Sequence, residues 1–101
     1  PNQVVILPVS EKNNDYSKKI YKKIRENKVR CVLDLRDEKV GAKIRKAELS
    51  KIPIMLVIGE KEESTNSVSV RRRKKGDIGK FDLDDFISNL VNEITNKELG
   101  Y

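Results

Sequence analysis

The sequence predicts a mixed α/β domain with a mostly parallel sheet of four to five strands and three helices. Short β-branched apolar runs alternate with segments of helical spacing, which is the order of a parallel α/β sheet. The run Ile54 to Ile58 contains no polar residue, as in a central strand that is covered on both faces. By contrast, Ser67 to Arg73 alternates apolar and polar residues, which indicates an antiparallel strand with one polar face.

The amino-terminal half predicts two strand–helix units. Gln3 to Leu7 is short, β-branched and apolar on both faces, which indicates a buried strand. In Asp15 to Lys28, apolar residues recur every fourth position among lysines and arginines, which predicts an amphipathic helix. The second strand is expected over Arg30 to Leu35. A second helix follows over Val40 to Ile52, and Pro53 ends it because proline cannot continue a helix.

The carboxy-terminal half predicts a hairpin and a last helix. The polar connection Glu60 to Asn66 is too short for a crossover helix, so the strand after it should run antiparallel. A turn and a short fifth strand over Ile78 to Phe81 complete the sheet. Asp82 can cap the last helix, and residues 95–101 are expected to form a frayed tail. The apolar stripe of this helix consists of Leu83, Phe86, Ile87, Leu90, Val91 and Ile94.

Composition indicates one domain over residues 1–101 with an anionic partner. Lys and Arg number 22 against 16 Asp and Glu, which gives a net charge of +6. This length holds one core but no catalytic domain beside it, and the chain begins at Pro1, so we expect a fragment of a larger protein. The lone Cys31 is expected in the core. No run approaches the ~20 apolar residues that span a membrane, and we expect a cytoplasmic location.

The sequence lacks the residues of common catalytic and metal sites. It has no histidine, which excludes the usual catalytic triad and any His-ligated metal. One cysteine and scattered carboxylates give no zinc spacing, and no glycine loop has a phosphate-binding pattern. We therefore expect a chain that binds rather than catalyses, with no catalytic residue, metal or cofactor of its own.

A group of charged residues follows the second predicted strand, at Arg36, Asp37, Glu38 and Lys39, with Arg45 on the next helix. In parallel α/β sheets, ligands bind at the carboxyl ends of the strands. This group is therefore either a site that reads a polar ligand or a set of ordinary solvated turn residues.

Three segments carry a family resemblance. They are Leu35 to Arg45 (L-R-D-E-K-V-G-A-K-I-R), Ile52 to Glu62 (I-P-I-M-L-V-I-G-E-K-E) and Val68 to Gly79 (V-S-V-R-R-R-K-K-G-D-I-G). In order and spacing they resemble the anticodon-binding domain of class II aminoacyl-tRNA synthetases, and within that class the threonyl-tRNA synthetases most closely. The resemblance runs from about Val4 to Leu90, and three ordered motifs are more specific than any single one.

The resemblance implies recognition of an anticodon loop, a single-stranded target whose bases expose their hydrogen-bonding edges. It places the base-reading positions on Asp37, Arg45, Lys61, Glu62 and Arg71. The forked donors of Arg71 suit guanine O6 and N7, and Glu62 can accept from a base N–H. Contacts to the RNA backbone are expected from Arg36, Lys39, Arg73 and Lys74.

Asp37 departs from the family pattern, which generally has asparagine at this position. Asparagine can donate and accept, whereas an ionised aspartate only accepts, and it adds negative charge near a polyanion. Either the base contact is made differently here, or Arg36 or Arg45 neutralises Asp37.

The leading hypothesis is the carboxy-terminal domain of a threonyl-tRNA synthetase. It implies a partner, the anticodon loop of threonine tRNAs, and a homodimeric parent ligase whose missing catalytic domain uses ATP, magnesium and zinc. Prolyl-, histidyl- and glycyl-tRNA synthetases share the fold and are alternatives, as is a non-catalytic accessory or interaction module of the same fold. A small α/β ligand-binding domain unrelated to RNA would instead show a deep apolar pocket.

Overall fold

The computed structural model describes residues 3–98, with side chains up to Thr95. Its five strands form one sheet in the order β2-β1-β3-β4-β5. The strands are β1 (Val4–Pro8), β2 (Cys31–Leu33), β3 (Ile54–Ile58), β4 (Ser67–Arg72) and β5 (Gly76–Asp82). The helices are the 3-10 helix η1 (Glu11–Asn13), α1 (Asn14–Glu26), α2 (Val40–Leu49), α3 (Glu60–Thr65) and α4 (Leu83–Glu98).

Strand directions follow the sequence pattern. β1 pairs parallel with β2 on one side and with β3 on the other, while β3–β4 and β4–β5 are antiparallel. The mixed, mostly parallel α/β class is confirmed. The fifth strand is longer than predicted, and a β-bulge between Val70 and Arg71 shifts its register against β4.

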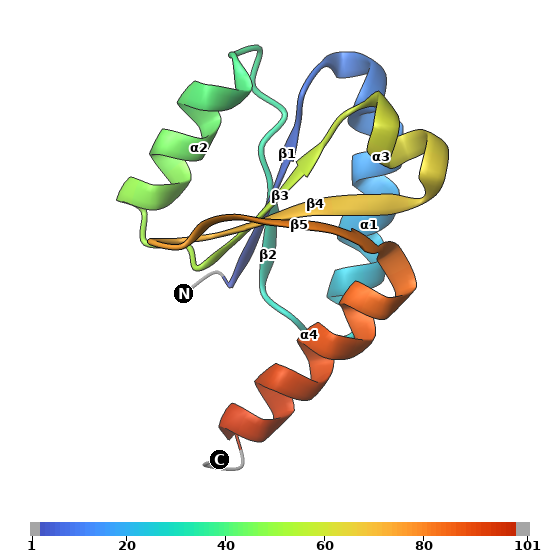
Figure 1. Cartoon of the computed structure of the whole chain (residues 1–101), viewed down its shortest axis with the longest axis vertical. Helices are drawn as coiled ribbons and strands as arrows, with labels where there is room; N and C mark the ends of the chain where they lie inside the picture. Colours follow the sequence, from blue (N-terminus) through green and yellow to red (C-terminus); the bar gives the residue numbers. More distant parts are fainter. Residues whose placement is uncertain (1–2, 99–101) are drawn as a thin grey trace.

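Helices cover the two faces of the sheet unequally, with α1 and α4 on one face and α2 alone on the other (Figure 1). β1 shows why its residues are all apolar: Val4 and Ile6 join the larger core under α1 and α4, whereas Val5 and Leu7 join the smaller core under α2. Cys31 belongs to the larger core as expected, and burial raises the pKa of its thiol to about 12.

The α2 side of β4 and β5 is what we call the open face. α2 packs on β1 and β3, and no residue of β4 or β5 belongs to its core. Strand register places Ser69 and Arg71 of β4 on this side, opposite Lys80 and Asp77 of β5. The polar half of the alternating strand therefore lies on a part of the sheet surface that α2 leaves uncovered.

Several boundaries differ from the sequence predictions. The polar segment after β3 is the short helix α3, so residues 3–98 contain four α-helices rather than three. β2 ends at Leu33, and Leu35 is 40 % exposed because the chain leaves the sheet there. α2 ends at Leu49, and Lys51 takes a left-handed conformation with φ 61° before the proline.

The start of α4 is as predicted, because Asp82 Oδ2 accepts the backbone N–H groups of Asp84 and Asp85 at 3.1 and 3.3 Å. Its end is not. The helix continues to Glu98, so the predicted tail is helical over 95–98, and residues 99–101 lie outside the described part of the chain. Within residues 3–98, no helix has the length and apolar character needed to cross a bilayer.

Candidate nucleic-acid interface

The segment after β2, residues 34–39, is held by a network of charges. Arg36 donates from Nε and Nη2 to the two carboxylate oxygens of Asp34, at 2.9 Å each, and its Nη1 lies 3.3 Å from Glu38 Oε2. The hydrogen bond from the Arg36 side chain keeps the pKa of Asp34 below its usual value. Arg36 therefore orders this segment through Asp34 and Glu38. Its guanidinium pairs with these two carboxylates and not with Asp37.

Lys43 is a buried residue that the sequence analysis did not single out. It is 4 % exposed, and its Nζ donates to the carbonyl oxygens of Pro8 and Asp34, both at 3.1 Å. Its burial could have been predicted from the sequence, because Val40, Lys43 and Ala47 share the inner side of α2 at helical spacing. A lysine between apolar residues of a buried stripe is the signal that could have found it.

Asp37 lies at the carboxyl edge of the sheet. It is exposed and helps to line a hollow of about 40 Å³ together with Lys43, Ser10 and Asn14. Among residues 3–98 it forms no hydrogen bond or ion pair through its carboxylate, so this group is available to a ligand.

Glu62 connects α3 to the open face. Its Oε1 accepts the backbone N–H of Gly59 at 2.7 Å, which caps the short helix, and its Oε2 accepts the Ser69 hydroxyl at 3.0 Å. The carboxylate is thus fixed beside β4. Lys61, the residue before it, is exposed on α3.

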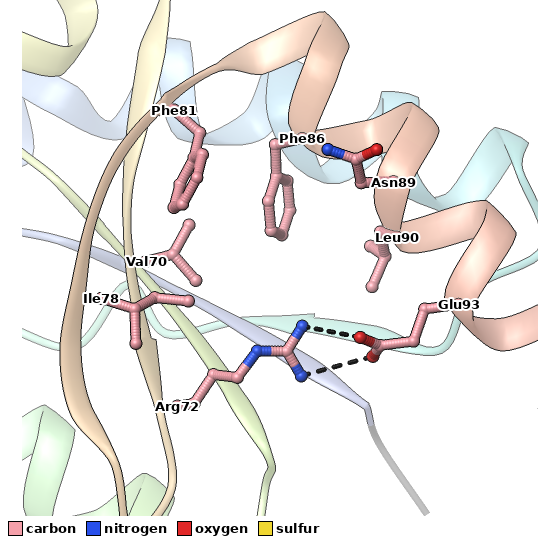
Figure 2. A pocket seen from close by; sticks show the side chains of 8 residues that line it. All are labelled: Val70, Arg72, Ile78, Phe81, Phe86, Asn89, Leu90 and Glu93. Atoms are coloured by element: carbon pink, nitrogen blue, oxygen red, sulfur yellow. Dashed lines mark hydrogen bonds and ion pairs between the residues drawn. The ribbon is translucent and has the colours of Figure 1, made fainter.

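Three consecutive arginines, Arg71, Arg72 and Arg73, have different surroundings. Arg72 forms a bidentate pair with Glu93 of α4 at 2.9 and 3.3 Å, on the face opposite the open one (Figure 2). Arg73 donates from Nε to the Glu48 carbonyl in the last turn of α2 at 3.0 Å. The Arg71 guanidinium has no partner in the described part of the chain, and its buried Nε lacks an acceptor.

The remaining predicted residues lie around α2 and the hairpin. Arg45 and Lys39 line an open hollow along the outer side of α2, where Leu49 is 77 % exposed. Lys74 is exposed in the turn between β4 and β5 with φ 72°. The structure thus brings Glu62 and Arg71 together along β4, places Asp37 at the carboxyl edge, and puts Arg45 on α2.

An apolar pocket lies on the other side of the sheet, between β4, β5 and α4 (Figure 2). Its volume is about 150 Å³, and the paired side chains of Arg72 and Glu93 form one end. Pockets for small-molecule ligands are commonly about 300–1,000 Å³. The alternative of a ligand-binding domain with a deep apolar pocket is therefore not favoured.

Comparison with known proteins decides the family. The family model described as "Anticodon binding domain" matches residues 3–93. The chain belongs to this family. The resemblance found in the sequence is thereby confirmed, and membership implies that this anticodon-binding domain binds tRNA.

Several relatives of this chain are threonine–tRNA ligases. It is 45 % identical over 98 residues to threonine–tRNA ligase of Aquifex aeolicus, covering 97 % of this chain and 15 % of that protein. For threonine–tRNA ligase of Acetivibrio thermocellus the identity is 51 % with the same coverage of both chains. The domain thus spans about 15 % of the length of these curated relatives.

Solved structures agree with this placement. The RNA-binding domain of threonyl-tRNA synthetase from Cryptosporidium parvum Iowa II is 28 % identical with a TM-score of 0.86, over 91 % of this chain and 23 % of that one. Prolyl-tRNA synthetase from Cryptosporidium parvum shares the fold, with 20 % identity and a TM-score of 0.81 over 96 % of this chain and 22 % of that one.

Proposed function

We propose that this domain reads the anticodon loop of threonine tRNAs and thereby supports the attachment of threonine by a parent threonine–tRNA ligase. The observation that carries the proposal is Arg71. Arg72 and Arg73 have acceptors within the domain, whereas the Arg71 guanidinium, on the open face, bonds none of the described residues. A guanine offers two acceptors, O6 and N7, that match this fork, and threonine anticodons have guanine in the middle.

In this proposal the other readers come from three elements near the open face and the carboxyl edge of the sheet. Glu62 keeps lone pairs beyond those used by Gly59 and Ser69, so it can still accept from a base N–H. Asp37 would meet the third anticodon base, a uridine, from the β2–α2 segment. Arg45 would meet the loop from α2, and Lys61 from α3. Lys39 and Lys74 are exposed and suit phosphate contacts.

Arg36 and Arg73 would contribute to binding mainly as charge. The Arg36 guanidinium already bonds Asp34 and Glu38, and Arg73 uses its Nε for the Glu48 carbonyl, so neither guanidinium is as free as that of Arg71. We keep both as backbone contacts in the proposal, with a smaller expected effect than Lys74 because an RNA phosphate would compete with acceptors that are already in place.

The parent protein supplies the remaining chemistry in this proposal. ATP, magnesium and zinc belong to its catalytic part, and the domain itself has no catalytic role. Length supports the division, since the relatives extend far beyond the segment matched here. The parent would act as a cytoplasmic homodimer.

Titration of the 101-residue chain with a panel of anticodon stem-loops tests the proposal. The panel contains a threonine loop, versions of it changed at the middle or third base, and proline, histidine and glycine loops. We expect tightest binding to the threonine loop and clear weakening when the middle guanine is replaced. Equal affinity for all loops would contradict it, and preference for another amino acid's loop would reassign the parent.

A further inference from the structure

We infer that Lys43 is a positioning residue for anticodon reading, which holds the segment 34–39 so that Asp37 is presented to the third anticodon base. The inference rests on the function proposed above. Lys43 is 4 % exposed, whereas Lys46 on the same helix is exposed. Its task must therefore be carried out inside the protein rather than by touching RNA.

The inner side of α2 is an unfavourable place for a lysine. Burial of an ammonium group costs free energy unless hydrogen bonds replace its water, and an apolar residue there often stabilises a core equally well or better. Lys43 faces the smaller core, yet Nζ finds carbonyl oxygens of Pro8 and Asp34, both at 3.1 Å. These two carbonyls lie at the end of β1 and directly after β2, so one side chain connects α2 to both strand ends.

From Asp34 the restraint continues toward Asp37. The Asp34 backbone N–H bonds the Ile6 carbonyl at 3.0 Å, which fixes where the chain leaves the sheet. The Asp34 carboxylate holds the Arg36 guanidinium, and the Glu38 N–H bonds the Arg36 carbonyl at 2.9 Å. Asp37 thus lies between two restrained residues, while its own carboxylate bonds nothing among residues 3–98.

The hollow beside Asp37 supports positioning over direct contact. Its volume is about 40 Å³, with Lys43 at its wall. A water needs about 10–15 Å³ of such space, so the hollow can hold water but is far too small for a nucleobase. A base must therefore meet Asp37 from outside, and Lys43 acts on the base only through the segment 34–39.

The test compares Lys43→Met with the matched control Lys46→Met, which removes an exposed lysine from the same helix. Each variant and the wild type are titrated with the threonine stem-loop and with loops changed at the third or middle base. We expect Lys43→Met to lose about tenfold in affinity for the threonine loop, with most third-base discrimination lost and middle-base discrimination by Arg71 kept. Lys46→Met should weaken all loops by one small factor.

Amide hydrogen exchange gives a readout that needs no RNA. The Asp34, Arg36 and Glu38 amides should exchange faster in Lys43→Met than in the wild type, with β3 unchanged. Unchanged amide exchange, or unchanged third-base discrimination, would overturn the inference. A proportional loss of discrimination at the third and middle bases would also overturn it, because it would indicate that the whole domain has become less ordered. If Lys43→Met does not fold, Lys43→Arg replaces it and should retain part of the third-base discrimination; complete loss in that folded variant would overturn the inference.

The wild type separates the two hypotheses. If it binds every loop equally, the proposed function fails, while the exchange comparison still shows whether Lys43 orders the segment. If the wild type discriminates and Lys43→Met discriminates equally well, only the role of Lys43 fails.

Discussion

The Nε of Arg71 is a buried donor without an acceptor among residues 3–98. Such a group costs about 1–3 kcal/mol when nothing completes it, and native proteins contain few of them. The two arginines that follow it differ, since Arg72 bonds Glu93 and Arg73 bonds the end of α2. The free protein thus carries a cost at Arg71 that a bound base can remove.

Arg71→Ala should weaken binding of the threonine stem-loop by about 1–3 kcal/mol and relax discrimination at the middle guanine. Thermal unfolding of the free variant should shift to a higher temperature, because the substitution removes a buried donor that had no acceptor among the described residues. Lys74→Ala is the matched control and should weaken all loops alike. If both variants lose affinity equally for matched and mismatched loops, Arg71 acts only as a charge.

Asp37→Asn should bind the threonine stem-loop more tightly. A like charge near a phosphate costs about 1 kcal/mol at ~4 Å in water, and an amide can also donate to a uridine oxygen. Because Arg36 bonds Asp34 and Glu38, the substitution should leave Arg36 in place. Titration of loops changed at the third base checks the reason: equal gains for every loop would mean that charge alone matters, and a clear loss would mean that the carboxylate itself is needed.

Glu62→Gln should change base preference at the third anticodon position more than overall affinity. The amide oxygen can keep the Gly59 N–H, and the amide N–H₂ can donate to the Ser69 hydroxyl, so the geometry of both bonds can survive. The base would then meet a side-chain amide, which both donates and accepts, in place of a carboxylate, which only accepts. Fluorescence titration with third-base variants measures this, and an unchanged preference would remove Glu62 from the reading surface.

At the scale of elements, the segment 34–39 depends on one ionised side chain. The hydrogen bond from Arg36 lowers the pKa of Asp34 in the folded state. The ionised Asp34 carboxylate therefore stabilises the fold at pH values above its unfolded-state pKa, and this contribution is lost as the pH falls through its lower folded-state pKa. Asp34→Asn should therefore lower the melting temperature at pH ~7, and its difference from the wild type should shrink below pH ~4.

Glu26→Gln is the control for that experiment, because Glu26 is exposed in the last turn of α1 and forms no ion pair with any described residue. It should leave the melting temperature nearly unchanged at both pH values. A difference between wild type and Asp34→Asn that stays constant with pH would show that the Asp34 carboxylate contributes shape rather than charge.

The elements also show what can be read from a sequence and what cannot. β1 and β3 were predictable because burial on both faces demands an unbroken apolar run, and β4 because its faces differ. α3 was missed since a six-residue helix with no buried residue leaves no periodic apolar pattern. The hydrogen-bond partners of Lys43 and Arg73 were not predictable, because Pro8 and Glu48 lie far from them in the sequence and meet them only in the folded chain.

For the molecule as a whole, binding should respond strongly to ionic strength. The net charge is +6, and exposed lysines surround the predicted readers on α2, α3 and the hairpin. The logarithm of the association constant should fall with the logarithm of salt concentration by roughly 0.7 for each single-stranded phosphate contacted. Stem-loop titrations across a range of potassium chloride concentrations measure this slope, and an affinity independent of salt would argue against backbone contacts.

The one-sided placement of α2 has an evolutionary consequence. α1 and α4 cover one face of the sheet (Figure 1), over the larger core. Strand register places Arg71, Ser69 and Lys80 on the opposite face. Solved synthetase structures with 20 and 28 % identity to this chain keep its fold, with TM-scores of 0.81 and 0.86. The larger core and the polar residues of β4 and β5 thus lie on opposite faces of the sheet, so substitutions on the open face can change recognition without disturbing the packing under α1 and α4.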